Sequence, residues 1–100
     1  MKILAITACP TGIAHTYMAA EQLERTGKAL GHVIKVETQG AMGIENRLTD
    51  ADIAGADALI LAADVAIEDR DRFHGIAQVL EVPVQLAIRN PAEIFARLRS

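Results

Sequence analysis

The stretch 5-AITACPTGIAHTYMAAE-21 decides the fold, because it joins an apolar run to an alanine-rich run of a different periodicity. Residues 2–8 are mostly apolar and include β-branched side chains, which is typical of a strand buried on both faces of a parallel sheet. The sequence CPTG at 9–12 interrupts this run. From residue 13 to residue 30 the spacing becomes helical. A strand, a tight turn and a helix in this order predict the opening unit of an α/β domain.

One face of the predicted helix is lined by small and apolar residues at spacings of three and four: Ala20, Leu23, Gly27 and Leu30. The absence of bulk at Ala20 and Gly27 would let the helix lie close to the sheet. Gly31 follows directly and predicts the end of the helix, since glycine adopts the left-handed conformation common at helix ends.

The rest of the chain continues the alternation of strands and helices. A strand beginning at residue 32 alternates Ile34 and Val36 with charged residues, which predicts an edge strand with one wet face that ends in a loop at 39–43. Thr49 and Asp52 form a capping-box pattern for a short helix through residue 54. The run at 57–64 is apolar between its terminal aspartates, and we expect it to be the central strand.

A charged connection at 68–75 predicts one helical turn closed by Gly75, and 77–82 predicts a fourth strand. Near the end of the chain, Asn90 as cap, Pro91 at the first position and Glu93 at the third position predict a last helix. We therefore expect an α/β fold with a four-stranded parallel sheet and helices on both faces, of the Rossmann-like or flavodoxin-like kind, as a single domain over residues 1–100.

Composition excludes several classes of function. The net charge is -3 and only 3% of residues are aromatic, so the charge and the stacking surface for nucleic-acid binding are missing. No apolar run reaches the roughly 20 residues of a membrane span, which argues against membrane insertion. A single cysteine forms no internal disulfide, and a reducing cytoplasm is expected. Cys9 and His15 lack further ligands for zinc, and His32 and His74 show no pairing pattern, so we expect neither metal nor cofactor.

The turn at 9–12 carries the predicted chemistry. A strand that runs into a turn and a helix aims backbone N–H groups at one point, and that point attracts anions such as phosphate. The candidate donors are the amides of Thr11, Gly12, Ile13, Ala14, His15 and Thr16. The same dipoles would stabilise the thiolate of Cys9 at the mouth of the ring. The alternative is an unreactive buried cysteine, the commonest role for a lone one.

Three side chains in and directly after the turn, those of Thr11, His15 and Thr16, have two open interpretations each. His15 is either a base or phosphate ligand, or a polar residue of the first helical turn. Thr11 and Thr16 either bind phosphate or cap the helix. The residues at 37–40 end a strand next to the first one and either border the Cys9 site or form an ordinary loop.

Two reactions use a cysteine in such a loop, hydrolysis of phosphoesters and relay of a phosphoryl group. Tyrosine phosphatases place an arginine six residues after the cysteine, where its guanidinium clamps the phosphoryl oxygens. This chain has His15 there, and the candidate general acids Asp64 and Asp69 lie in no clear motif. Relay by a phosphoryl carrier is favoured, with a small cysteine-dependent phosphatase as the alternative.

The segments TACPTGIAHTYMAAEQL and KVETQG, with DAD before the third strand and RFHG after it, resemble the fructose-type enzyme IIB component of the bacterial phosphoenolpyruvate-dependent sugar phosphotransferase system. The resemblance implies that Cys9 is the catalytic residue. It would accept phosphate from a phosphohistidine of enzyme IIA and pass it to a fructose-like sugar held by the membrane enzyme IIC. Ala41 stands where many relatives have serine, and Ile76 where a lysine often follows the glycine.

The resemblance also implies a location in the cytoplasm, with docking at the inner membrane through enzyme IIC. A carrier must present Cys9 to two proteins in turn, so the interfaces should be small and transient. We expect a monomer, because tight dimerisation over the Cys9 face would block transfer.

Overall fold

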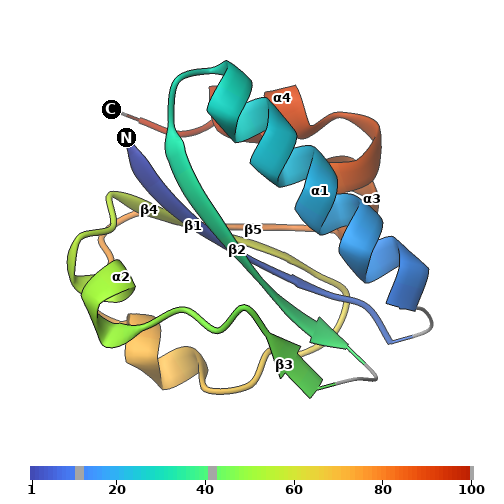
Figure 1. Cartoon of the computed structure of the whole chain (residues 1–100), viewed down its shortest axis with the longest axis horizontal. Helices are drawn as coiled ribbons and strands as arrows, with labels where there is room; N and C mark the ends of the chain where they lie inside the picture. The colour runs from blue at the N-terminus through green and yellow to red at the C-terminus, as the bar shows by residue number, and fades with distance from the viewer. Residues whose placement is uncertain (11–12, 41–42, 100) are drawn as a thin grey trace.

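Strand β1 (Lys2–Ala8) lies in the middle of the sheet and carries the residue before Cys9. The structure is a computed structural model that describes residues 1–10, 13–40 and 43–99, without the side chain of residue 13. The remaining elements are α1 (Ile13–Ala29), β2 (Val33–Gly40), β3 (Gly43–Glu45), α2 (Asp50–Ala54), β4 (Ala58–Ala63), η1 (Arg70–Phe73), β5 (Val79–Val82), α3 (Val84–Arg89) and α4 (Pro91–Ala96). Together they form an α/β fold (Figure 1).

The sheet has five strands in the order β3-β2-β1-β4-β5. The four strands expected from the sequence are β1, β2, β4 and β5, and they pair in parallel. The prediction of four strands was wrong by one, because β3 adds a short antiparallel pair to the end of β2. A strand of only three residues is too short to show an alternating pattern. β4 is central, as predicted, whereas β2 is an edge strand only over its first half, before its pairing with β3 begins at Thr38.

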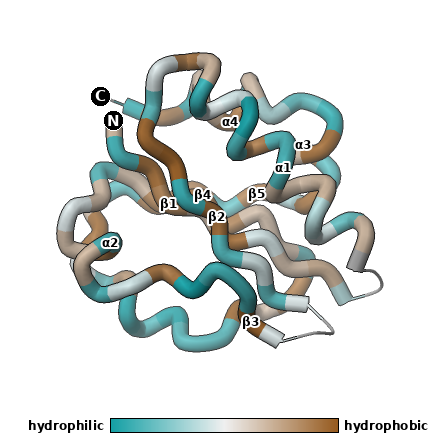
Figure 2. The backbone as a smooth tube through the Cα atoms, viewed as in Figure 1, coloured by the Kyte–Doolittle hydropathy of each residue, from teal (hydrophilic) through white to brown (hydrophobic). Residues whose placement is uncertain are grey.

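Helices cover both faces of the sheet, as expected. On the upper face, α1, α3 and α4 pack on Ile3, Ala5, Val36 and Ile60, and the buried side chains of this layer include Leu23, Ile94 and Phe95. On the lower face, α2 and the turn η1 cover a smaller cluster built on Leu4, Ile6, Leu59 and Leu61. In Figure 2 the central strands are largely brown, whereas the segment through η1 below them is largely teal. Burial of apolar surface on the two faces is the main force that holds the three layers together.

Ile76 belongs to the lower cluster, with 7% of its surface exposed. The lysine expected at this position in relatives is therefore replaced by a core residue, and position 76 contributes little to any partner surface of this chain. Ala41, the other departure, lies outside the described residues.

Helix α1 ends as the sequence predicts. Gly31 has a φ of 84°, the Gly31 amide donates to the carbonyl of Lys28 at 3.0 Å, and the His32 amide donates to that of Gly27 at 2.9 Å. This is the two-bond closure of a Schellman motif. The predicted apolar face was wrong at its last position, because Leu30 is 53% exposed and the helix has ended at Ala29.

Two further caps were predicted from the sequence. The Thr49 side chain accepts from the Asp52 amide and Asp52 accepts from the Thr49 amide, so the capping box is confirmed. Asn90 does occupy the N-cap position of α4, but its side chain makes no capping hydrogen bond. Pro91 at the first helical position is therefore the predicted start signal that the structure retains.

At Gly27, helix α1 lies in close contact with β2 and α4. A Cβ at Gly27 would lie 3.0 Å from Cδ1 of Ile34 and 3.2 Å from Cζ of Phe95. This confirms that the absence of a side chain at Gly27 sets the distance between α1, β2 and α4.

Gly27→Val is expected to lower the free energy of unfolding by about 1–3 kcal/mol, because the added methyl groups overpack this contact. Urea denaturation measures the effect. Ala29→Val is the matched control, since Ala29 is exposed on the same helix and valine there costs less than about 1 kcal/mol. Valine has a higher helix propensity than glycine, so a Gly27→Val chain that is at least as stable as the wild type would show that the contact at Gly27 has room for a side chain.

No helix in the part of the chain that the structure describes has the length and apolarity needed to cross a membrane.

Candidate functional site

Cys9 lies at the carboxyl end of β1, between the ends of the two neighbouring strands. Ala8, directly before it, is paired with Gln39 of β2 on one side and with Ala63 of β4 on the other. The Asp64 amide donates to the Ala8 carbonyl at 3.1 Å, which fixes the strand end. Cys9 is half-buried and rests on the upper core without being enclosed by it. The thiol therefore sits at the edge where sites form in parallel sheets.

The start of α1 faces this edge. The helix begins at Ile13, so the amides of residues 13, 14 and 15 have no acceptor within the helix. The helix dipole adds a partial positive charge at the same end. Thr11 and Gly12, two of the predicted phosphate-binding residues, lie outside the described residues. The described part of the turn thus supplies three of the six predicted amide donors at a helix N-terminus.

The remaining predicted residues separate into exposed and buried positions. Ala14 and His15 are exposed on the first turn of α1. Thr16 is only 1% exposed, and its carbonyl accepts a hydrogen bond from Thr7 Oγ1 at 3.0 Å. Because Thr7 is also fully buried, this bond ties the first turn of α1 to β1 two residues before Cys9. The Thr16 side chain therefore lies beneath the helix, away from the exposed rim that His15 occupies.

The two candidate general acids have other partners. Asp64 Oδ1 accepts a hydrogen bond from the Val84 amide at 3.2 Å and so caps the start of α3. Asp69 pairs with Arg47 at 2.8 Å, and the hydrogen bond from this guanidinium holds the pKa of Asp69 below its usual value. A carboxyl group held in its ionised form is a poor proton donor for a leaving alcohol.

A buried polar cluster lies under the end of β2 and was not predicted. The sequence pattern placed Glu37 on a wet face, but the residue is 0% exposed. Arg72 of η1 donates to both of its carboxylate oxygens, at 3.0 and 2.6 Å, and the Leu48 amide donates at 2.8 Å. Gln39 donates to the same carboxylate at 2.9 Å. Glu37 and Arg72 are 35 positions apart, so no local pattern could have brought them together.

Two opposing effects act on the pKa of Glu37. Burial raises it, because a carboxylate loses its hydration in the interior. The hydrogen bonds from Arg72, Gln39 and the Leu48 amide lower it, and together they outweigh burial. The net pKa of Glu37 therefore lies below its ordinary value, and the buried side chain is ionised at neutral pH.

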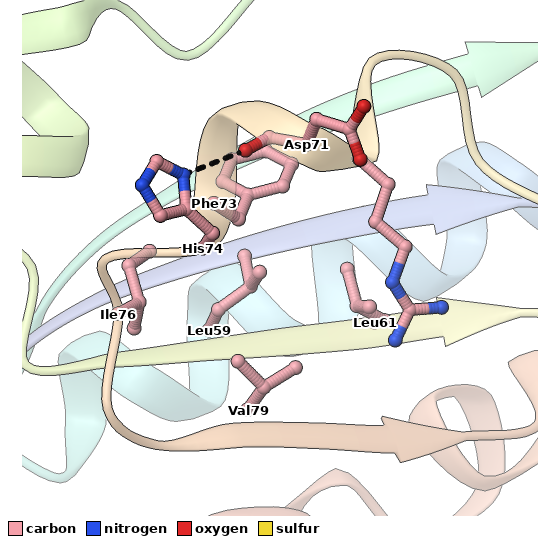
Figure 3. Close-up of a pocket in the computed structure, with 8 residues that line it drawn as sticks. Leu59, Leu61, Asp71, Phe73, His74, Ile76 and Val79 are labelled. Atoms are coloured by element: carbon pink, nitrogen blue, oxygen red, sulfur yellow. Dashed lines mark hydrogen bonds between the residues drawn. The ribbon is translucent and has the colours of Figure 1, made fainter.

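A separate hollow of about 310 Å³ lies on the lower face between η1 and the strands β4 and β5 (Figure 3). Its apolar wall consists of Leu59, Leu61, Phe73, Ile76 and Val79. Arg70 also lines the hollow, and its guanidinium is already paired with Glu81 at 2.9 Å. Cys9 is not among the lining residues, so the hollow is not part of the site around the thiol.

Within residues 1–10, 13–40 and 43–99, no group of three or more His, Cys, Asp or Glu side chains is placed so that it could hold a metal ion.

Comparison with known proteins identifies the family. The family described as "PTS system, Lactose/Cellobiose specific IIB subunit" matches residues 4–97. The chain is 46% identical to the "PTS system fructose-like EIIB component 2" of Escherichia coli over 99% of its own length and 92% of that protein. It is 51% identical to the "Fructose-like PTS system EIIBC component" of the same organism, of which it spans 20%.

Solved structures agree with these relatives. A domain of the fructose-specific IIABC component of Borrelia burgdorferi superposes with a TM-score of 0.89 at 48% identity, covering 95% of this chain and 89% of that one. The enzyme IIB subunit of the phosphotransferase system from Escherichia coli superposes with a TM-score of 0.87 at 47% identity, covering 95% and 87%. The α/β fold of this chain is therefore the architecture of a known group of proteins. This chain belongs to the IIB subunit family of the bacterial sugar phosphotransferase system and is of the fructose-like type.

Proposed function

We propose that this chain carries a phosphoryl group on Sγ of Cys9 during the uptake of a fructose-like sugar. The observation that carries the proposal is the position of this sulfur. It is half-buried at the carboxyl end of β1, opposite a helix N-terminus whose first amides have no acceptor within the helix. A thiolate and, after transfer, a phosphoryl group with two negative charges both suit such a position.

The proposed reaction has two steps. In the first, the Cys9 thiolate attacks the phosphorus of a phosphohistidine on enzyme IIA, so that an S–P bond forms and the P–N bond breaks, and the electron pair returns to the imidazole. In the second, a hydroxyl oxygen of the sugar on enzyme IIC attacks the same phosphorus. The O–P bond forms, the S–P bond breaks, the hydroxyl proton leaves to solvent or a base of enzyme IIC, and the thiolate is regenerated. No cofactor takes part in either step.

The amides from Thr11 to Thr16, that is Thr11, Gly12, Ile13, Ala14, His15 and Thr16, are proposed to hold the phosphoryl oxygens. Backbone donors fit a relay, because they stabilise the phosphoryl group on sulfur without a fixed guanidinium to support attack by water. The position that carries arginine in phosphatases is His15, and it is exposed. Arg47 holds the pKa of Asp69 below its usual value, and Asp64 already accepts from the Val84 amide, so both candidate general acids have other partners and the phosphatase alternative is disfavoured.

Both partners are proposed to dock around Cys9, with the chain acting as one domain over residues 1–100 at the cytoplasmic side of the membrane. Three exposed apolar side chains support this surface: Tyr17 and Met18 on α1, and Val65 after β4, between 39% and 48% exposed. A small apolar rim of this kind suits a transient interface with each partner, and a monomer leaves it accessible.

Mass spectrometry of the intact chain tests the proposal. After mixing with an enzyme IIA component charged from phosphoenolpyruvate, the chain is expected to gain one phosphoryl group, located on Cys9 by fragmentation. Treatment with iodoacetamide before mixing should prevent the gain, because alkylation blocks the sulfur. A phosphoryl group on any other residue, or uptake that survives alkylation, would contradict the assignment.

A further inference from the structure

The side chain of Gln39 forms two hydrogen bonds to the backbone of a second segment near Cys9, at Glu68. We call this pair of hydrogen bonds the Gln39 grip. Gln39 is paired in the sheet with Ala8, the residue before Cys9, and only 9% of its surface is exposed. Its Oε1 accepts a hydrogen bond from the Glu68 amide at 2.8 Å, and its Nε2 donates to the Glu68 carbonyl at 3.2 Å. The side-chain amide thus pairs with one residue through both its donor and its acceptor, as a neighbouring strand would.

The orientation of this amide is fixed by a third contact. Nε2 of Gln39 also donates to Oε2 of Glu37 at 2.9 Å. A reversed amide would set its NH₂ group against the Glu68 N–H and its oxygen against a carboxylate, so only one orientation fits. Glu37 is itself held by Arg72 and by the Leu48 amide. The Gln39 side chain that binds Glu68 is therefore held in place by the buried hydrogen bonds around Glu37.

The segment that Gln39 holds, residues 64–69, borders the Cys9 site on the β4 side. At its first residue, the Asp64 amide binds the Ala8 carbonyl, and its carboxylate binds the Val84 amide. Near its last residue, the grip on Glu68 is joined by the exposed ion pair of Asp69 with Arg47. The Asp69 carbonyl also accepts a hydrogen bond from Arg72 Nε at 3.1 Å, and exposed ion pairs contribute little, so the Gln39 grip and this bond are the main polar restraints described at this end. Val65 lies between the two ends and is 41% exposed.

We propose that Gln39 is a positioning residue for phosphoryl transfer, because its grip on Glu68 holds the segment 64–69 in the shape that the phosphorylated donor protein contacts beside Cys9. This inference rests on the proposed function. It assigns to Gln39 no contact with the phosphoryl group, since its side chain points to the lower face, whereas Cys9 packs on the upper face. Loss of the grip leaves the thiol intact and loosens one side of the docking surface.

The test compares Gln39→Met with Gln78→Met. Methionine has nearly the same length as glutamine and cannot hold both backbone groups. Gln78 makes an equivalent two-way grip on Arg99, at 2.8 and 2.6 Å, next to the start of β5 at the other end of the sheet. Its loss therefore controls for the general effect of removing such a contact.

Initial rates of phosphoryl uptake are measured over a range of concentrations of phosphorylated enzyme IIA. Gln39→Met is expected to raise the KM for this donor about tenfold with kcat changed less than about twofold, because a loosened surface must be ordered on each encounter. The rate of Cys9 alkylation by iodoacetamide, which needs no docking surface, is expected to stay within about twofold of the wild-type rate. Gln78→Met should leave KM unchanged.

Hydrogen exchange of the Glu68 amide reports the grip directly and is expected to accelerate at least about tenfold in Gln39→Met. If exchange accelerates while KM stays at the wild-type value, or if Gln78→Met raises KM equally, the positioning role is overturned. Should Gln39→Met not fold, Gln39→Asn, which keeps the amide but is one methylene shorter, takes its place with the same expected results. A wild-type chain that takes up no phosphoryl group overturns the proposed function itself, which is a different outcome from wild-type uptake with an unchanged KM in the variant.

Discussion

Replacing Cys9 by serine is expected to reduce phosphoryl uptake from phosphorylated enzyme IIA by at least about 10³-fold. Serine has nearly the same shape, so the strand end and the following helix should keep their places. Its hydroxyl stays protonated at neutral pH and is a far weaker nucleophile than a thiolate. The measurement is transfer of labelled phosphate from enzyme IIA, followed over time at fixed donor concentration.

Ala77→Ser is the matched control for this substitution. Ala77 is exposed and precedes β5, at the opposite end of the sheet from Cys9, so an added hydroxyl there should leave uptake at the wild-type rate. A Cys9→Ser chain that still accepts phosphate, with the label on His15, would show that the exposed histidine is the true acceptor. Retention of the fold in both variants is checked by amide resonances of the sheet.

Arg72→Met is expected to lower the free energy of unfolding by about 3–5 kcal/mol, because it leaves the carboxylate of Glu37 buried without its countercharge. The side chain of Glu37 is 0% exposed and that of Arg72 13% exposed, so water cannot replace the lost partner. The guanidinium carbon of Arg72 also lies 4.5 Å from the centroid of the Phe73 ring, and methionine loses this cation–π contact as well. Urea denaturation gives the free energy directly.

The double variant Glu37→Gln/Arg72→Met is expected to be more stable than Arg72→Met alone. The neutral amide removes the buried charge and keeps an oxygen for the Leu48 amide. If the free energy of unfolding of the double variant falls by the sum of the losses measured for Glu37→Gln alone and Arg72→Met alone, the two side chains do not act as a pair. In that case the unpaired carboxylate of Glu37 is not the cause of the loss.

Acidification gives a second measurement on the same pair. The pKa of Glu37 is depressed in the folded state, so its contribution to stability is complete above the ordinary pKa of 4.5 and is lost as the pH falls below it through the folded value. The wild type should therefore lose more stability on acidification than the double variant. Asp52 and Glu81 also have depressed pKa values, but their causes do not include Arg72, so they cancel in the comparison. Asp69 keeps its main partner Arg47 in both proteins and loses only the weaker charge effect of Arg72.

The site divides into a part that local sequence could predict and a part that it could not. Cys9 and the start of α1 are consecutive in the chain, and a strand, a turn and a helix are each encoded within a few residues. The buried cluster of Glu37, Arg72 and Gln39 joins β2 to η1, more than thirty positions away. Alternation in the sequence placed Glu37 in water, because an isolated strand pattern cannot show that an arginine from elsewhere covers that face.

The sequence by itself determined the order of β1, α1, β2, α2, β4, η1, β5 and α4, the capping box at Thr49, the end of α1 at Gly31 and the place of Cys9 between strand and helix, but it predicted neither β3 nor α3. All of these depend on periodicity and on the backbone preferences of a few neighbouring residues. Only the tertiary structure decided the added strand β3, the burial of Glu37 and Ile76, and the grip of Gln39 on Glu68. Each of these results from contact between segments that are distant in the chain, where burial and charge pairing outweigh local preference.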